Sequence, residues 1–527
     1  MSAERQRGSD RRANFPWVGA RKLIQLLFLM GFLYTFALIG RQGRMGQDPA
    51  HWLGEIPLQL DPLIALAHST AGRVFLRSSL LALVMVVLTL IFGRVWCGWL
   101  CPLGTLLDWF SIRKPGEKVR IPESWRRVKY VLLGVIFIGA LFSNLTLLIF
   151  DPLTLIYRTL TTAVWPALNQ MITAGEKLFY RVPFLQEPVA VFDGFARRHL
   201  LPSELLGYRA AWLFAGLFLG VIALNAAAPR FWCRYVCPLG GVLGLFGKAS
   251  WIRCRVNARC TECGMCEAVC PTGAISGEGG GRCVSSECTM CMACQDACSH
   301  QAVHFTPELS FSERQPFDPG RREVLISLGI SLAGFGLARV PLSGKKIHPH
   351  RLHPPGAQGE SFLGLCVRCG ECLAACPTGG LQPALLESGW TGLWSPVLVP
   401  RLGQCDYSCR SCAQACPVQA IPLLSLESKR KQVIGKAYLN RGRCIAWEEE
   451  RDCIVCEEMC PVPEKAITFL RKEIEDPEGN LIEVLQPQID RELCIGCGIC
   501  EHQCPVEGEA AIRVFSPGWQ PDILDYH

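Results

Sequence analysis

The sequence predicts a membrane all-α region, with four transmembrane helices and a fifth further along, joined to two cysteine-rich α+β domains. Two observations predict this division. Half of the 527 residues are hydrophobic and only 19% are charged, and the apolar residues are concentrated before residue 250. The 30 cysteines fall mostly in short blocks after that point. This composition excludes a disordered chain and an ordinary soluble enzyme of this length.

Four apolar stretches precede the cysteine-rich part, each near the ~20 residues that a helix needs to cross a bilayer. They are residues 23–40, 74–92, 130–150 and 210–228. Basic residues are concentrated before the first stretch, between the second and third, and after the fourth, and such residues near span ends stay in the cytoplasm. The sequence therefore predicts a multi-pass protein of the bacterial inner membrane, with its N-terminus and first cysteine-rich domain in the cytoplasm.

A further apolar run follows Arg321 and Arg322 and continues to Ala338, which is the layout of a twin-arginine export signal. As a fifth span that leaves the cytoplasm, it places the residues after about 345 in the periplasm. The alternative is a buried or interfacial helix, because about fifteen apolar residues are marginal for spanning.

The cysteine blocks have the spacing of iron-sulfur ligands. A [4Fe-4S] cluster needs four thiolates, of which a Cys-x2-Cys-x2-Cys loop supplies three and a distant cysteine the fourth. Two such blocks follow residue 250: Cys260, Cys263, Cys266, Cys270, and Cys288, Cys291, Cys294, Cys298. Four more follow residue 360, two of them with a longer first spacing: Cys366, Cys369, Cys372, Cys376; Cys405, Cys409, Cys412, Cys416; Cys444, Cys453, Cys456, Cys460; and Cys494, Cys497, Cys500, Cys504. We therefore expect six [4Fe-4S] clusters, with zinc as the alternative metal.

Four of the remaining cysteines form a duplicated motif, Trp-Cys-x3-Cys-Pro-Leu-Gly. They are Cys97 and Cys101 in the first copy and Cys233 and Cys237 in the second. We expect these thiols either to bind an additional metal or cluster or to exchange electrons as dithiols. Inert packing is the alternative, although it suits a lone pair better than a duplicated one. Cys254 and Cys283 are expected to be structural.

Residues 1–310, with these predicted spans, the duplicated motif and the paired cluster blocks, resemble the NapH family of membrane quinol dehydrogenases. The remainder, a twin-arginine segment leading four cluster motifs, resembles its partner NapG, so the chain resembles a NapH–NapG fusion. The resemblance implies a quinol dehydrogenase component of anaerobic respiration. It would take electrons from quinol in the membrane quinone pool and deliver them to a periplasmic reductase or multihaem cytochrome.

The sequence contains no Gly-rich nucleotide fingerprint, and no nucleic acid partner is expected. The alternative function is a redox regulator or assembly factor for a metalloenzyme of the copper-oxidase or copper-reductase type. A purely structural docking subunit would not need six clusters.

Family resemblance also implies how the blocks share their fourth ligands. In a two-cluster ferredoxin, Cys298 would complete the first site and Cys270 the second. The last four blocks resemble four-cluster subunits of molybdenum reductases, in which the outer motifs pair together and the inner motifs pair together. Cys504 would then complete the first of these blocks and Cys376 the fourth, with Cys460 and Cys416 exchanged between the inner blocks. Local pairing of first with second and third with fourth remains open.

The predicted domains follow this order: 1–22, a cytoplasmic basic tail; 23–250, the four-helix membrane domain; 251–310, a two-cluster ferredoxin-like domain; 311–344, the twin-arginine segment and fifth helix; 345–360, a linker; and 361–527, a four-cluster ferredoxin-like domain. No residue is assigned as catalytic. Asp61, His68, Asp108 and Asp151 flank predicted spans, and each is expected to be a solvated loop or capping residue.

Overall fold

The computed structural model describes residues 17–45, 52–74, 79–111, 121–199, 201–202, 206–276, 281–308, 329–330, 332–333, 348–357, 359–385, 387–475 and 481–519. The predicted twin-arginine segment and fifth span, apart from four of their residues, lie outside these ranges.

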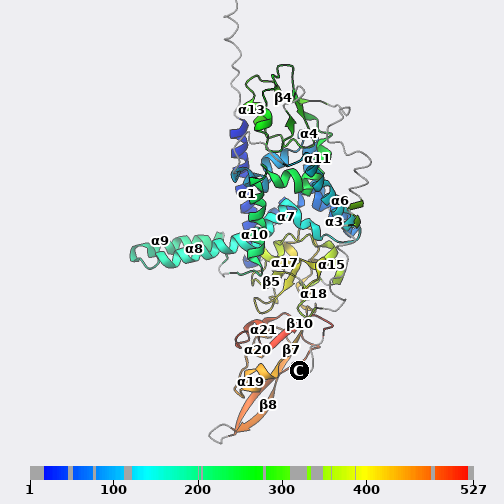
Figure 1. Ribbon diagram of the computed structural model, residues 1–527. Coiled ribbons are helices and arrows are strands. Elements are labelled where there is room, and N and C mark those ends of the chain that lie inside the picture. Colours follow the sequence, from blue (N-terminus) through cyan, green and yellow to red (C-terminus); the bar gives the residue numbers. More distant parts are fainter. Residues whose placement is uncertain are drawn as a thin grey trace, which may run out of the picture.

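The molecule is elongated and has three parts stacked end to end (Figure 1). A first unit (residues 251–308) lies at one end, a helical region (residues 17–250) in the middle, and a second unit (residues 348–519) at the other end. A hairpin of two helices projects sideways from the helical region. The two cysteine-rich units are therefore separated by the helices that join them.

The helical region is built from short helices packed around one long helix. The helices are α1 (Trp17–Met45), α2 (Trp52–Gln59), α3 (Pro62–Gly72), α4 (Leu80–Phe92), α5 (Pro102–Trp109), α6 (Arg127–Leu141), α7 (Pro152–Thr159), α8 (Trp165–Phe179), α9 (Gln186–His199), α10 (Ala211–Ala223) and α11 (Pro238–Gly247). Three π-helical turns interrupt them: η2 (Trp96–Leu100), η5 (Leu160–Val164) and η8 (Trp232–Val236). Helices α3 and α7 begin alike, because Asp61 and Asp151 each cap a helix whose first residue is proline.

Among the described residues, one helix is long and apolar enough to cross a membrane, the Trp17–Gly40 part of α1. Helices α4 and α10 have 13 residues each, about 20 Å against a hydrocarbon core of about 30 Å. Helix α6 stops at Leu141, where Ser143 turns the chain with a positive φ of 54°. The predicted fold of four transmembrane helices with a fifth, and the multi-pass topology, are therefore wrong. Apart from the first, which lies within α1, these runs have the apolar composition of spans but do not form helices of spanning length in the described residues.

The first unit consists of two small antiparallel sheets and two short helices. Strand β1 (Ile252–Val256) pairs with β4 (Val303–Pro307), and β2 (Ile275–Ser276) pairs with β3 (Arg282–Cys283). The helices are α12 (Met265–Ala268) and α13 (Ala293–Ala297), and each holds the end of one cysteine loop.

The second unit repeats this scheme of short helices between strand pairs. The helices are α15 (Gly359–Leu365), α16 (Glu371–Ala374), α17 (Ser411–Gln414), α18 (Leu426–Arg430), α19 (Ile445–Glu448), α20 (Val455–Glu458) and α21 (Ile499–Gln503). The strand pairs are β5 (Leu381–Pro383) with β6 (Pro396–Leu398), β7 (Lys436–Leu439) with β10 (Ile512–Phe515), and β8 (Ile467–Glu475) with β9 (Leu481–Ile489). All are antiparallel.

Candidate metal centres

One cavity of the first unit is lined by the cysteines Cys260, Cys263, Cys266 and Cys298. The residues on either side of Cys263 have positive φ, 54° at Glu262 and 72° at Gly264, so the loop curls and its thiols face one space. The backbone N–H of Ala302 donates to Sγ of Cys298 at 3.2 Å. A loop of three thiols and one distant thiol thus converge, with backbone N–H support of the kind that tunes iron-sulfur clusters.

A second cavity of the same unit is lined by Cys270, Cys288, Cys291 and Cys294. The residues on either side of Cys291 again have positive φ, 53° at Met290 and 59° at Met292. Cys283 lines this cavity as well, and it interacts with Cys254. Each block is therefore completed by the last cysteine of the other block, which is the pairing implied by the resemblance to two-cluster ferredoxins.

Two cavities of the second unit have the same construction. One is lined by Cys366, Cys369, Cys372 and Cys416, and the other by Cys494, Cys497, Cys500 and Cys460. Positive φ again flanks the middle cysteine, at Arg368 (59°) and Gly370 (89°) in one loop and at Gly496 (73°) and Gly498 (79°) in the other.

The other eight cysteines of the second unit form two further groups. Cys376 interacts electrostatically with Cys405 and Cys412. Cys504 does so with Cys444 and Cys456. The structure therefore pairs the first block with the second and the third with the fourth. The outer-with-outer pairing implied by the molybdenum-reductase resemblance is wrong here, because consecutive blocks fold against each other, α16 on α17 and α20 on α21.

The geometry of these sites fits a cluster better than a single ion. No group of three His, Cys, Asp or Glu side chains in the described ranges converges closely enough for one metal ion. Four thiolates around one zinc would lie about 3.8 Å apart. The four cavities that these cysteines line instead measure about 300 to 390 Å³, including space open to solvent. A [4Fe-4S] cluster bound there would supply a one-electron carrier.

The buried cysteine thiols of these sites need a positive charge nearby to become thiolates. Burial raises the pKa of Cys405 and of Cys456 to about 12. Such thiols become thiolates when a cationic metal core compensates their charge. Iron binding and thiol deprotonation are therefore coupled at these sites.

The thiols of the duplicated motif also meet. Cys97, Cys101, Cys233 and Cys237 lie together in the helical region, each 4 to 7% exposed. They join the same apolar core as Trp96 and Trp232. The sequence predicted a shared role for these thiols, and the structure brings the two copies together.

The acidic candidates are buried rather than solvated. Asp61 and Asp151 are fully buried and hydrogen-bond each other, and each also caps a helix. Burial raises the pKa of Asp61 to about 6, so this pair holds a proton. His68 is buried as well. Asp108 forms an ion pair with Arg230 at 2.6 Å.

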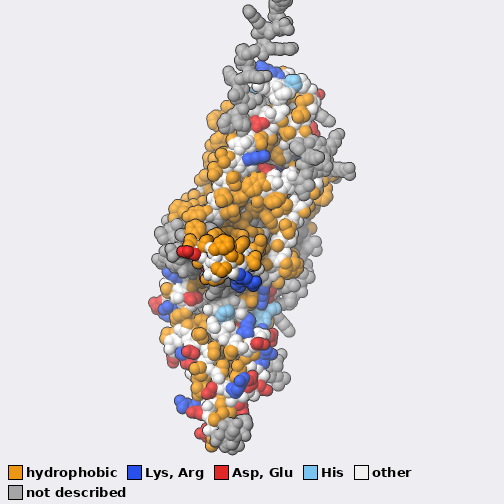
Figure 2. All heavy atoms as spheres, turned by 90° about the vertical axis from the view of Figure 1, so that its left-hand side faces the viewer, with side chains coloured by type: hydrophobic (Ala, Val, Ile, Leu, Met, Phe, Trp, Pro, Cys, Tyr) orange, Lys and Arg blue, Asp and Glu red, His pale blue; other side chains and the backbone are white. Residues whose placement is uncertain are grey.

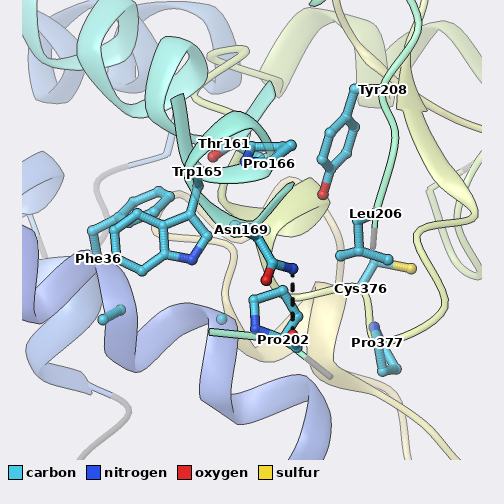
Figure 3. A pocket seen from close by; sticks show the side chains of 13 residues that line it. Phe36, Thr161, Trp165, Pro166, Asn169, Pro202, Leu206, Tyr208, Cys376 and Pro377 are labelled. Carbon is cyan, nitrogen blue, oxygen red and sulfur yellow. Dashed lines mark hydrogen bonds between the residues drawn. The ribbon is translucent and has the colours of Figure 1, made fainter. Parts of the chain in front are cut away.

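A cavity that no sequence pattern indicated lies where α1 and the start of α8 meet the second unit (Figure 3). Its walls include Phe36, Trp165, Asn169, Tyr208, Cys376 and Pro377. These residues come from four distant segments, so no local motif could reveal the cavity. One of its walls is a cysteine of the second unit.

Fold and sites together define the class of protein: an electron-transfer protein that carries several [4Fe-4S] clusters in ferredoxin domains. Family models described as "4Fe-4S binding domain" match residues 256–276 and 487–508, 285–301, and 74–121 and 210–258. A model described as "4Fe-4S dicluster domain" matches residues 365–421. The dicluster match contains the first two blocks of the second unit, in agreement with their local pairing.

The chain belongs to the family of ferredoxin-type proteins that includes MauM and NapG. It is 36% identical to the methylamine utilization ferredoxin-type protein MauM of Methylorubrum extorquens over 210 residues, 38% of this chain and 90% of MauM. It is 36% identical to the ferredoxin-type protein NapG of Escherichia coli K12 over 181 residues, 34% of this chain and 75% of NapG.

A third relative, the methylamine utilization ferredoxin-type protein MauN of Methylobacillus flagellatus, is 25% identical over 262 residues, 48% of this chain and 76% of MauN. The predicted recognition of a chain that combines two ferredoxin-type proteins, one of them NapG-like, is confirmed. No solved structure matches the chain.

Proposed function

We propose that this protein oxidises a membrane quinol and passes the electrons through six [4Fe-4S] clusters to a periplasmic reductase or multihaem cytochrome. The ligands of these clusters are the 24 cysteines of the six blocks, grouped as the cavities group them. The observation that carries the proposal is the cavity lined by Cys376, which places aromatic and other apolar side chains next to a cysteine ligand of a cluster.

The cavity has the chemistry of a quinol ring site (Figure 3). Trp165 packs edge-on against Phe36 with ring centroids 5.3 Å apart, which gives one apolar wall. Tyr208 forms another wall, and its hydroxyl donates to the carbonyl of Leu373 at 3.1 Å, so the phenol oxygen can still accept from a quinol hydroxyl. A ring bound between these walls would lie beside the loop that holds Cys376.

Quinol oxidation releases protons as well as electrons, and polar side chains lead away from the cavity. Asn169 on the cavity wall accepts from Arg197. Arg197 pairs with Glu176 at 3.1 Å and with Asp193 at 2.9 Å, and the side chain of Asp193 is 46% exposed. The two carboxylates offer released protons a path to solvent along the α8–α9 hairpin.

Membrane association is proposed from the surface around this cavity. The Trp17–Gly40 part of α1 is long and apolar enough to enter a bilayer. Hydrophobic side chains cover the middle of the face shown in Figure 2, whereas charged ones are concentrated toward the second unit. Trp212 and Phe184 are both 77% exposed, which suits contact with lipid better than with water. A hydrophobic quinol would reach the cavity from this surface.

The test is to add a quinol analogue to membranes that contain the protein and to monitor cluster reduction through the visible absorbance of the clusters. We predict that Trp165→Ala slows quinol-dependent reduction about tenfold, because it removes the aromatic wall. Reduction by dithionite, which needs no quinol site, should stay unchanged. Trp390→Ala, a tryptophan of the second unit that is 44% exposed, is the matched control.

Equal rates for Trp165→Ala and the unaltered protein would show that quinol does not react in this cavity. Direct reduction of the purified protein by NADH would point to another function, since the sequence contains no nucleotide fingerprint.

A further inference from the structure

The helical region contains two copies of one local structure with the sequence Arg-x-Trp-Cys-x3-Cys-Pro-Leu-Gly, residues 94–104 and 230–240. Each copy forms one π turn followed by a helix, η2 then α5 and η8 then α11. The N–H of Cys101 donates to the carbonyl of Trp96, and that of Cys237 to Trp232, both at 2.8 Å. Cys101 and Cys237 are the N-caps of their helices, so each copy presents its thiols in the same way.

The two copies meet at their cysteines. Cys101 interacts electrostatically with Cys233 and Cys97, and Cys237 interacts with all three of the others. A "4Fe-4S binding domain" match covers each copy separately, and the first of its segments, 74–121, contains a single cysteine pair. Neither pair suffices for a cubic cluster, whereas the two pairs together supply four thiols.

Two buried arginines cross between the copies. Arg94 of the first copy lies over Gly240 of the second, where a Cβ would come within 2.7 Å of its Nη2. Arg230 of the second copy lies near Gly104 of the first and donates to the carbonyl of Cys97 at 2.8 Å. Both arginines are at most 1% exposed. Each copy thus places a cation beside the thiols of the other.

The ion pairs around these arginines leave positive charge uncompensated. Arg94 and Lys129 share one carboxylate, that of Glu287, at 3.3 and 2.6 Å. Arg230 and Arg21 likewise share Asp108, at 2.6 and 3.8 Å. Each network therefore has more cations than carboxylates, and buried uncompensated charge is costly.

The donors of Arg94 show where a partner is missing. Its Nε and Nη2 atoms are buried and have no hydrogen-bond partner, although Nη1 bonds to Ser286 and Glu287. Nη2 lies over Gly240, and the guanidinium interacts electrostatically with Cys97 and Cys237. An anionic group held by these thiols would satisfy it.

We propose that Cys97, Cys101, Cys233 and Cys237 bind a further [4Fe-4S] cluster. A core in its 2+ state with four thiolates carries two negative charges, which would compensate the excess of buried cations beside these thiols. The cluster would accept one electron into its iron and give one electron on. It adds a centre to the six that the cysteine blocks provide.

Dithiol exchange fits these thiols less well. Such chemistry needs an accessible thiolate, whereas all four sulfurs are buried. A metal core removes this obstacle because it binds thiolates directly.

The location of the proposed cluster suits electron transfer between the first unit and the second unit. Trp99 of η2 donates to the carbonyl of Met290 at 2.8 Å, and a Cβ on Gly98 would overlap the carbonyl oxygen of Thr289. Both partners belong to the Cys288–Cys291 loop of the first unit. On the other side, the ring of Trp232 lies 6.2 Å from Phe150 in the part of the helical region next to the second unit. The proposed cluster occupies the stretch between the two cluster-bearing units in Figure 1.

The experiment is iron analysis with Mössbauer spectroscopy on the full chain purified without oxygen. Seven cubic clusters give about 28 iron atoms per chain, whereas six give about 24. Cys237→Ala should lower the count by about four, while Val236→Ala, the adjacent residue of the same π turn, should leave it unchanged.

About 24 atoms in the unaltered protein, all in cubic clusters, would overturn the proposal, and so would a folded Cys237→Ala variant with undiminished iron. If that variant does not fold, the count for the unaltered protein decides alone. These readouts do not use quinol, so failure of the proposed quinol oxidation remains separate from failure of this site.

Discussion

The two ends of the helical region meet their cysteine-rich units through different chemistry. Toward the first unit, the buried polar groups are ionised pairs, above all Arg94 and Lys129 around Glu287. Burial alone would raise the pKa of Glu287, but Lys129 and Arg94 hold it below the usual value. Toward the second unit, the buried carboxyls instead retain a proton, as Asp61 and Asp151 do.

This difference separates two tasks. An ionised interface keeps its charge over the neutral pH range and can compensate a charged cluster beside it. Protonated carboxyls suit the end where the proposed quinol cavity lies, because quinol oxidation moves protons there. The first end thus carries buried ionised groups and the second end buried protonated carboxyls.

The largest expected effect comes from breaking the ionised interface. Glu287→Gln leaves Arg94 and Lys129 buried without their counter-charge, which should cost about 3 to 5 kcal/mol. We expect the thermal transition of the first unit to fall by several degrees or more, measured in detergent.

The control is Glu308→Gln, which removes an exposed ion pair with Arg255 in the same unit. Its transition should remain where it is, because exposed pairs contribute little. Equal shifts of the thermal transition for both variants would show that Glu287 does not stabilise the interface between the first unit and the helical region.

The interface between the helical region and the second unit should depend on Arg158, which forms hydrogen bonds and a cation–π contact rather than an ion pair. Its guanidinium donates to the carbonyls of Arg368 and Ile149 at 3.1 and 3.2 Å and lies 4.4 Å from the centre of the Trp394 ring. Arg158→Ala should destabilise the contact by about 2 to 3 kcal/mol through lost hydrogen bonds and cation–π contact. Faster proteolysis of the second unit would report it, with the exposed Arg471→Ala as control.

The sequence was a better guide to the ligands than to the helices. Cysteine spacing identified each loop of three thiols because the loop is local, and the positive φ at Gly264 or Gly498 follows from that spacing. The fourth ligands of the second unit were left open between two pairings, and the one that the resemblance implied is wrong, because the pairing depends on which short helices pack together. Apolar runs overstated the helices, since composition does not show that the chain turns at Ser143.

Other features could not be predicted from sequence. The cavity at Trp165 and Cys376 has walls from four distant segments. The crossing of Arg94 and Arg230 depends on the two motif copies meeting. Asp61 and Asp151 were correctly expected to include capping residues, but the interaction between them joins residues 90 positions apart and has no local sequence signal.

The smallest expected effect concerns the pH dependence of that pair. The pKa of Asp61 is raised to about 6 in the folded protein, mainly by burial, against 3.8 ordinarily, so the folded state binds more protons than the unfolded state between these values. Stability contributed by protonated Asp61 is therefore present below about pH 3.8 and is lost as the pH rises from there through about 6. Asp61→Asn keeps a capping oxygen and supplies N–H donors in place of the proton. We expect this variant to gain on the order of 1 kcal/mol over the unaltered protein between pH 5 and pH 7. Thermal unfolding across this range measures the difference. A variant whose stability runs parallel to that of the unaltered protein at every pH would show that the two carboxyls do not share a proton, and the contrast between the two ends would then rest on the ionised interface alone.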